Sequence, residues 1–212
     1  MPENIAGVAV PDSALAVAAT ELVRDTTNEL IYNHSRRVFL FGSLQAERMN
    51  LQPNAELLYV AAMFHDLGLV AAYQNEDQRF ELDGAAHARA FLTSHGYSTA
   101  DADTVWTAIA LHTTPEIPYG MAPEIAATTA GVETDVLGLR LDTLTTEEIG
   151  AVTAAHPRPK FKARILEAFT NGFKDRPDTT FGTVNADVLR HFVPGYRHID
   201  FVEVIQNSAW HE

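Results

Sequence analysis

The sequence contains no cysteine. Disulfide bonds and thiolate ligands are therefore excluded, and any bound metal would have to be held mainly by histidine and carboxylate side chains. The sequence also lacks a run of about 18 apolar residues, so we predict no membrane-spanning helix. The opening stretch MPENIAGVAV has neither a basic start nor a long apolar core. We therefore expect no signal peptide and a cytoplasmic location.

Basic residues are scarce. The sequence has 15 lysines and arginines and 28 acidic residues, which gives a net charge of −13. A surface of this charge repels phosphate backbones and anionic membranes. We therefore expect no nucleic-acid partner and no membrane partner. A small-molecule substrate that is neutral or cationic would meet no such barrier. The sequence does not fix the oligomeric state, and a homo-oligomer is compatible with it.

The chain of 212 residues is long enough for one good core, and its 46% of hydrophobic residues is ordinary for a globular protein. It carries no repeat and no low-complexity tract, so we predict one domain over residues 1–212. Apolar residues recur at helical spacing along the whole chain. They predict helices over 11–23, 34–49, 53–68, 84–95, 100–112, 123–138, 149–156, 160–174, 185–193 and 199–210.

Capping signals support several of these helices. Asp12 and Ser13 precede the first, and Thr145 with Glu148 matches a capping box. Asp83 is expected to cap the helix that follows it. Pro123 stands at a first-turn position, where its missing N–H costs nothing. No convincing pair of strands is present. The predicted fold class is all-α.

The stretch LLYVAAMFHDLGLV, residues 57–70, sets an imidazole and a carboxylate side by side at the end of an apolar helix. Alone, the pair His65-Asp66 is typical of a helix end, with the carboxylate solvated and the imidazole packed. His34 begins another predicted helix. Asp135 lies in a helix of mostly small and apolar residues, where a buried carboxylate needs a partner. The alternative is that Asp135 shares a solvated face with Glu133.

Three separate helices that converge in a bundle can build a metal site from facing side chains. His34, His65-Asp66 and Asp135 would supply two imidazoles and two carboxylates. Zinc, iron and manganese all suit such a set. The other histidines include His95, His156, His191, His198 and His211, which lie near predicted helix ends or in polar segments and are interpreted as solvated or capping residues.

The order His…His-Asp…Asp on separate helices resembles the HD-domain superfamily of metal-dependent hydrolases. Within it, the stretches HSRRVFLFG, AAMFHDLGLV, RFELDGAAHARAFL, VWTAIALHTTPEI and GVETDVLG are similar to the cyanamide hydratase-like branch. The resemblance covers residues 34–138. It implies a helical HD bundle with a metal-binding core at about 30–140 and C-terminal helices at about 141–212. It also implies one divalent metal, usually zinc, with iron or manganese as alternatives, on His34, His65, Asp66 and Asp135.

Two positions differ from the phosphohydrolase branches of this superfamily. Many of those carry a lysine directly after the HD-x-G turn, where this chain has Leu69. Two-metal members place a histidine at the head of the next helix, where this chain has Asp83. His112 resembles a second extra-ligand position. These differences favour a single metal, although Asp83 and His112 could hold a second ion.

The resemblance predicts hydration of a small nitrile-like molecule, cyanamide to urea, by a water that the metal activates. Asp83 and His112 are the candidate catalytic residues, because both are expected near the metal and a proton must pass from water to the nitrile nitrogen. One alternative is a phosphohydrolase, which would bring basic residues to the metal, namely Arg36, Arg37, Arg79 or Arg140. Others are a metal-containing binding protein without turnover and a di-iron oxygenase.

Overall fold

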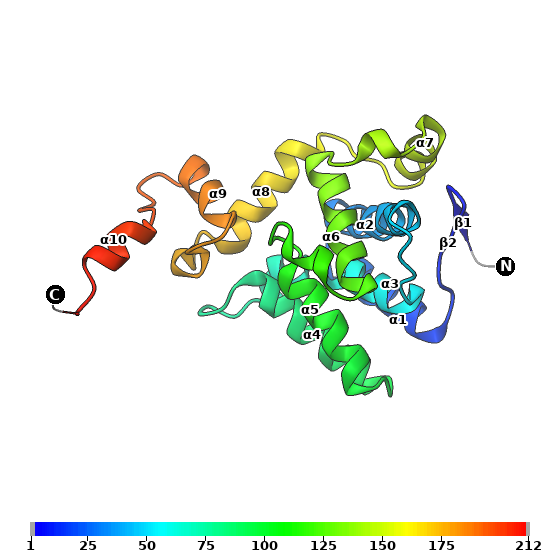
Figure 1. Cartoon of the computed structure of the whole chain (residues 1–212), viewed down its shortest axis with the longest axis horizontal. Helices are drawn as coiled ribbons and strands as arrows, with labels where there is room; N and C mark the ends of the chain where they lie inside the picture. The colour runs from blue at the N-terminus through cyan, green and yellow to red at the C-terminus, as the bar shows by residue number, and fades with distance from the viewer. Residues whose placement is uncertain (1–2, 211–212) are drawn as a thin grey trace.

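The computed structural model describes residues 3–210, which are mostly helical (Figure 1). This confirms the predicted all-α class. The ten α-helices in this range are α1 (Ala14–Thr26), α2 (Glu29–Arg48), α3 (Ala55–Phe64), α4 (Phe80–Ser94), α5 (Thr99–Leu111), α6 (Pro123–Leu137), α7 (Thr146–Ala155), α8 (Phe161–Phe173), α9 (Asn185–Phe192) and α10 (Phe201–Gln206). Short 3₁₀ segments lie at η1 (Leu67–Leu69), η2 (Ala71–Tyr73), η3 (Ile117–Gly120), η4 (Leu141–Thr143) and η5 (Pro177–Thr180).

A small hairpin precedes the helices, contrary to our prediction that no strand pair is present. Strands β1 (Asn4–Ile5) and β2 (Val8–Ala9) pair antiparallel. Each strand has two residues, which is too short to give a readable alternation of apolar and polar positions. The hairpin lies at the opposite end of the molecule from α10 (Figure 1).

The predicted capping signals at three helix starts are confirmed. Ser13 is the N-cap of α1 and accepts a hydrogen bond from the backbone N–H of Ala16. Thr145 and Glu148 form the predicted capping box at α7, and Pro123 is the first residue of α6. These signals act within one turn of the chain, which is why sequence alone reveals them.

Two helices begin about one turn or more before the predicted position, and several others begin within three residues of it. Helix α2 begins at Glu29, because Asn28 caps it by accepting from the N–H of Ile31. His34 therefore lies in the second turn of α2 and not at its start. Helix α4 begins at Phe80, so Asp83 lies in its first turn and does not cap it. Both shifts change the direction in which the candidate site residues point.

Helix α3 forms the centre of the bundle, and every residue from Leu57 to Phe64 is buried. It lies against α1, α2, α5 and α6, while α4 and α5 form a helical hairpin beside it (Figure 1). Because α3 ends inside the molecule, the His65-Asp66 pair that follows is held in the interior. The apolar surface buried around α3 is the main stabilising contribution of this core.

Helices α2 and α6 cross at close range, and a glycine makes this possible. A Cβ atom at Gly131 of α6 would lie 2.2 Å from the carbonyl oxygen of Val38 in α2. Real Cβ atoms do not come so near a backbone oxygen, so a larger residue would force the helices apart. The crossing brings His34 of α2 beside Asp135 of α6.

The C-terminal helices form a second group. Helix α8 packs Phe161 and Ile165 against Leu30 and Ile31 of α2. At its other end Phe173 packs with Phe80 and Leu189. Helix α10 stands apart beyond α9 (Figure 1). Among the described helices, none combines the length and the apolar character that crossing a membrane requires.

Candidate metal centre

Three helix segments bring three of the predicted ligands and the predicted catalytic residue His112 together in the interior. His34 projects from α2, and His65 and Asp66 follow the last turn of α3. His112 occupies the corresponding position after α5. All four are at most 3% exposed. Polar groups this deeply buried require partners of their own.

Hydrogen bonds to the Nδ1 atoms fix how each imidazole is turned. Nδ1 of His65 lies 2.8 Å from the carbonyl oxygen of Ala62, and Nδ1 of His112 lies 2.6 Å from that of Ile109. Nδ1 of His34 lies 2.7 Å from Oδ2 of Asp135. Because these partners only accept, each Nδ1 carries a proton, and a ring in its neutral form presents an unprotonated Nε2.

The unprotonated nitrogens face Asp66. Nε2 of His34 and Nε2 of His65 are 3.1 Å apart, and they lie 3.5 and 3.3 Å from Oδ2 of Asp66. Nε2 of His112 is 3.7 Å from Oδ1 of Asp66. Within residues 3–210, neither oxygen of Asp66 has a hydrogen-bond partner. Electron pairs thus face one another across a buried space, an arrangement that a cation would stabilise.

A divalent metal fits this space. His34, His65 and Asp66 each offer one ligand atom, and these atoms lie within 4.8 Å of one another. Two imidazoles and a carboxylate form a donor set of borderline hardness, which leaves metal identity open among several ions.

Asp135, the fourth predicted ligand, contacts the far side of His34. Its Oδ2 accepts from Nδ1 of His34 and from Arg37, while Oδ1 accepts from Arg37 and Arg158. Burial opposes the ionised carboxylate, but His34 and Arg37 outweigh it and lower the pKa of Asp135. In this position Asp135 orients the imidazole from behind. Its role as a direct ligand stays a prediction.

Asp83, a predicted catalytic residue, is engaged by other groups. Nη1 of Arg176 donates to its Oδ2 at 2.5 Å, and Nε2 of Gln78 donates to its Oδ1 at 3.0 Å. Arg176 also donates to the carbonyl oxygen of Gly68. Asp83 thus joins the segment after the HD pair to the C-terminal part of the chain. A catalytic role for it stays a prediction, and its observed contacts are structural.

Glu81 is a candidate that the sequence did not single out. It is fully buried, and its Oε1 accepts from Oγ1 of Thr113 at 2.6 Å, directly after His112. Arg79 and Asn185 also donate to it. Burial raises the pKa of Glu81, but the hydrogen bond from Arg79 outweighs this and the net pKa is lowered. The sequence analysis placed the start of this helix at residue 84. Because α4 begins at Phe80, Glu81 lies in its first turn and points into the interior.

Aromatic rings close the remaining side. The ring of Phe161 lies 5.2 Å from that of His34, and the ring of Phe80 lies 5.5 Å from that of His112. Phe80 in turn stacks on Phe173. That side of the candidate centre is therefore apolar, which strengthens electrostatic interactions inside it.

His156 differs from our expectation for the histidines near helix ends. It is buried, and its Nε2 accepts from Nε of Arg36 at 3.2 Å. Burial and the adjacent guanidinium lower the pKa of His156 to about 4. His95, His191 and His198 are not buried. His211 lies outside the described residues.

The comparisons with known proteins agree with this geometry. The family model described as HD domain matches residues 31–164, which is more than half of the chain. The chain belongs to the HD domain family. The matched range contains His34, His65, Asp66, His112 and Asp135. A search of curated proteins found no match.

Membership in the HD domain family makes this chain one of a family of metal-dependent hydrolases, and the buried His/His/Asp cluster is a group of residues that could hold the divalent metal. The family match is to the HD domain as a whole. The narrower resemblance to cyanamide hydratases, the choice of zinc and the single ion stay predictions.

Proposed function

We propose that this HD domain protein hydrates a small, neutral, nitrile-like molecule, with cyanamide to urea as the reaction to test and zinc as the metal. The observation that carries the proposal is that the arginines around the centre are already paired with carboxylates. Arg37 and Arg158 pair with Asp135, Arg176 with Asp83, and Arg79 with Glu81.

Paired arginines bear on the choice of substrate because a phosphoester needs cationic donors. Recognition of phosphate typically uses a guanidinium fork or a lysine. Arg36 donates to Tyr59, His156 and Glu3, away from the candidate centre. Leu69, at the position where many phosphohydrolases have lysine, packs with the apolar clusters around α8. These surroundings favour a substrate without charge.

When bound, a divalent metal supplies Lewis acidity and a nucleophilic water near neutral pH. Hydration of a nitrile joins the oxygen of water to carbon and places both protons of water on nitrogen. A group of the protein must therefore take a proton and return it. We assign this to His112, whose unprotonated Nε2 faces Asp66.

The second proton-handling residue predicted from sequence was Asp83, and we propose Glu81 in its place as a positioning residue. Glu81 acts through Thr113, which follows His112 in the chain and donates to the Glu81 carboxylate. The rings of Phe80 and Phe161 exclude bulk water from the reacting groups.

Phosphoester hydrolysis is the second candidate function, and one observation favours it besides family membership. The side chain of Arg79 is 33% exposed and stands beside Glu81, so its guanidinium could contact a charged substrate as well. A binding protein without turnover is the third alternative, and the same experiment tests it.

The test is to load purified protein with zinc, iron or manganese, to measure bound metal, and to follow urea formation from cyanamide. His65→Ala should lose both metal and urea formation. His95→Ala, which removes an exposed histidine from the end of α4, is the matched control and should retain both. A phosphoester and nucleotide panel runs in parallel. Hydrolysis of that panel without urea would reject the hydratase, and no turnover by metal-loaded protein would reject both activities.

A further inference from the structure

The segment of residues 201–210 packs little against the rest of the described chain. All ten residues are exposed, and they include Phe201, Val202, Val204, Ile205 and Trp210. Helix α10 within it has six residues, which is well below the length at which an isolated helix is stable in water. The ring of Phe201 contacts that of Phe181, with the ring centres 6.5 Å apart. A short apolar helix of this kind is stabilised by packing against another surface.

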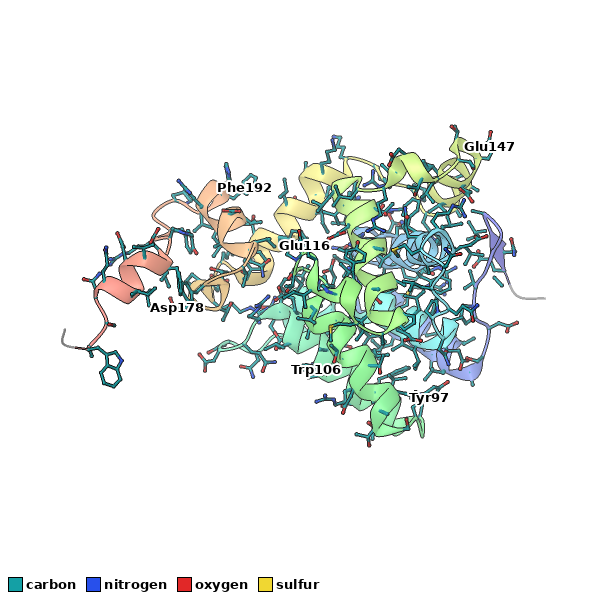
Figure 2. All side chains as sticks on the ribbon, viewed as in Figure 1. Tyr97, Trp106, Glu116, Glu147, Asp178 and Phe192 are labelled. Atoms are coloured by element: carbon teal, nitrogen blue, oxygen red, sulfur yellow. The ribbon has the colours of Figure 1, made fainter. Side chains whose placement is uncertain are left out.

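A matching surface lies on the outer side of α8 and α9. A groove of about 420 Å³ is lined mainly by apolar atoms of Ala163, Leu166, Glu167, Thr170, Asn171 and Phe192. These α8 positions recur every three or four residues, so they form one stripe along the helix. The opposite side of α8 carries the buried Phe161, Ile165 and Phe173. Phe192 adds a half-exposed ring at the outer surface of α9 (Figure 2).

The lysines around α8 are opposite in charge to the 201–210 segment and its cap Asp200, whereas the one charged side chain that lines the groove, Glu167, is acidic. Residues 198–210 contain Asp200 and Glu203 but no lysine or arginine. The α8 segment is basic within an acidic chain, and Lys160, Lys162 and Lys174 are exposed there. The remainder of the surface would repel an acidic helix, since the chain carries a net charge of −13.

The connection between α9 and α10 directs α10 away from the α8–α9 groove of the same chain. The hydroxyl of Tyr196 lies 2.8 Å from Oγ1 of Thr180, and the Tyr196 ring packs with the cluster of Phe173 and Leu189. Residues 197–200 alone separate this anchor from α10. Figure 1 shows α10 leading outward beyond α9, on the side away from α8.

We propose that two copies of this chain form a dimer in which the 201–210 segment of each copy lies in the α8–α9 groove of the other. The exchange is symmetric, so both copies bury the same surfaces. Two such contacts, each built around a ten-residue segment with a tryptophan, would bury on the order of 1,200 Å², at the lower end for a stable dimer. The proposal is independent of the chemistry at the metal centre.

The test uses the metal-loaded full chain with Trp106→Phe, which leaves Trp210 as the single tryptophan. Sedimentation and light scattering should give a dimer, and Trp210 emission should shift to shorter wavelength as concentration rises. Val204→Asp should raise the dimer dissociation constant at least tenfold. Val17→Asp, at a valine that is equally exposed on α1, should leave it unchanged.

A mixing experiment identifies the groove. Leu166→Asp should likewise raise the dimer dissociation constant at least tenfold, with circular dichroism showing that the helices are retained. Mixing this variant with Val204→Asp should restore association, because one intact segment then meets one intact groove. A wild-type monomer at all concentrations would overturn the proposal, and so would a dimer that Val204→Asp leaves unchanged. A monomer with buried Trp210 would also overturn it, since the segment would then close on its own chain.

Discussion

Oδ2 of Asp135 lies 2.7 Å from Nδ1 of His34. This contact fixes the imidazole with its Nε2 directed at His65 and Asp66. The same carboxylate receives a two-point contact from Arg37, which is completely buried. Asp135 therefore orients the imidazole of His34 and neutralises the buried guanidinium of Arg37. The two effects can be measured separately.

Replacing this carboxylate should affect both stability and metal binding. Asp135→Asn leaves the buried Arg37 without its counter-ion, and we expect the free energy of unfolding to fall by about 3–5 kcal/mol. Metal affinity should fall roughly 10–100-fold through loss of the orienting contact. Urea denaturation and metal competition measure the two effects. Glu133→Gln, on the same helix, is the control, and complete loss of metal in Asp135→Asn would show instead that Asp135 is a direct ligand.

Metal removal should destabilise the protein, because the unprotonated nitrogens of His34, His65 and His112 then face Asp66 without a cation between them. Chelation should lower the melting temperature of the wild type, and adding back a divalent ion should restore it. His65→Ala should show little response to either treatment. A wild-type melting temperature that is insensitive to both chelator and metal would contradict the assigned centre. Differential scanning calorimetry provides the measurement.

Glu81 and Asp83 should have separable effects, although they lie in the same turn of α4. Glu81→Gln should lower kcat and leave the amount of bound metal unchanged. Glu81 accepts a hydrogen bond from Thr113 and pairs with the partly exposed Arg79. Asp83→Asn should lower the free energy of unfolding by about 2–3 kcal/mol, because the buried Arg176 loses a charged acceptor. Steady-state kinetics, metal analysis and denaturation of both variants make the comparison. Equal loss of kcat in the two variants would argue that Asp83 also takes part in catalysis.

The helices and the central pair were predictable from sequence because their signals are local. Ser13, Thr145 and Pro123 act within one turn of the helix that each begins. The burial of α3 follows from its pattern, because the helix before the His65-Asp66 pair is apolar on every side. Family resemblance then supplied His34 as the partner from a distant helix.

What sequence did not reveal depends on contacts between distant segments. Arg176 and Asp83 are 93 residues apart, and nothing near either residue indicates that they pair. The burial of Glu81 was not predicted, because the expected helix began at residue 84 and left Glu81 in the loop before it. The apolar residues of α10 carry the pattern of a buried helix, and only the fold shows that they are exposed.

Two glycines in helices should respond to alanine in opposite directions. Gly131→Ala places a Cβ against the backbone of α2, and we expect destabilisation of about 1–3 kcal/mol together with weaker metal binding. Gly150 of α7 has open space around it, so Gly150→Ala should stabilise the protein by about 0.5–1 kcal/mol. Thermal denaturation of both variants checks the prediction, and destabilisation by both would show that the close crossing of α2 and α6 is not the cause.

His156 should make stability depend on pH. Its pKa is lowered to about 4 by burial and by Arg36, so the folded state keeps the ring neutral while the unfolded state binds a proton below about 6.5. The unfolded state therefore holds more protons between these values, and stability falls as pH decreases from about 6.5 to 4. His156→Gln should flatten that part of the curve relative to wild type. His95→Gln, at an exposed histidine, should leave the dependence of stability on pH unchanged. Denaturation curves of chelated protein across this range provide the test, and identical slopes for wild type and His156→Gln would refute the assignment.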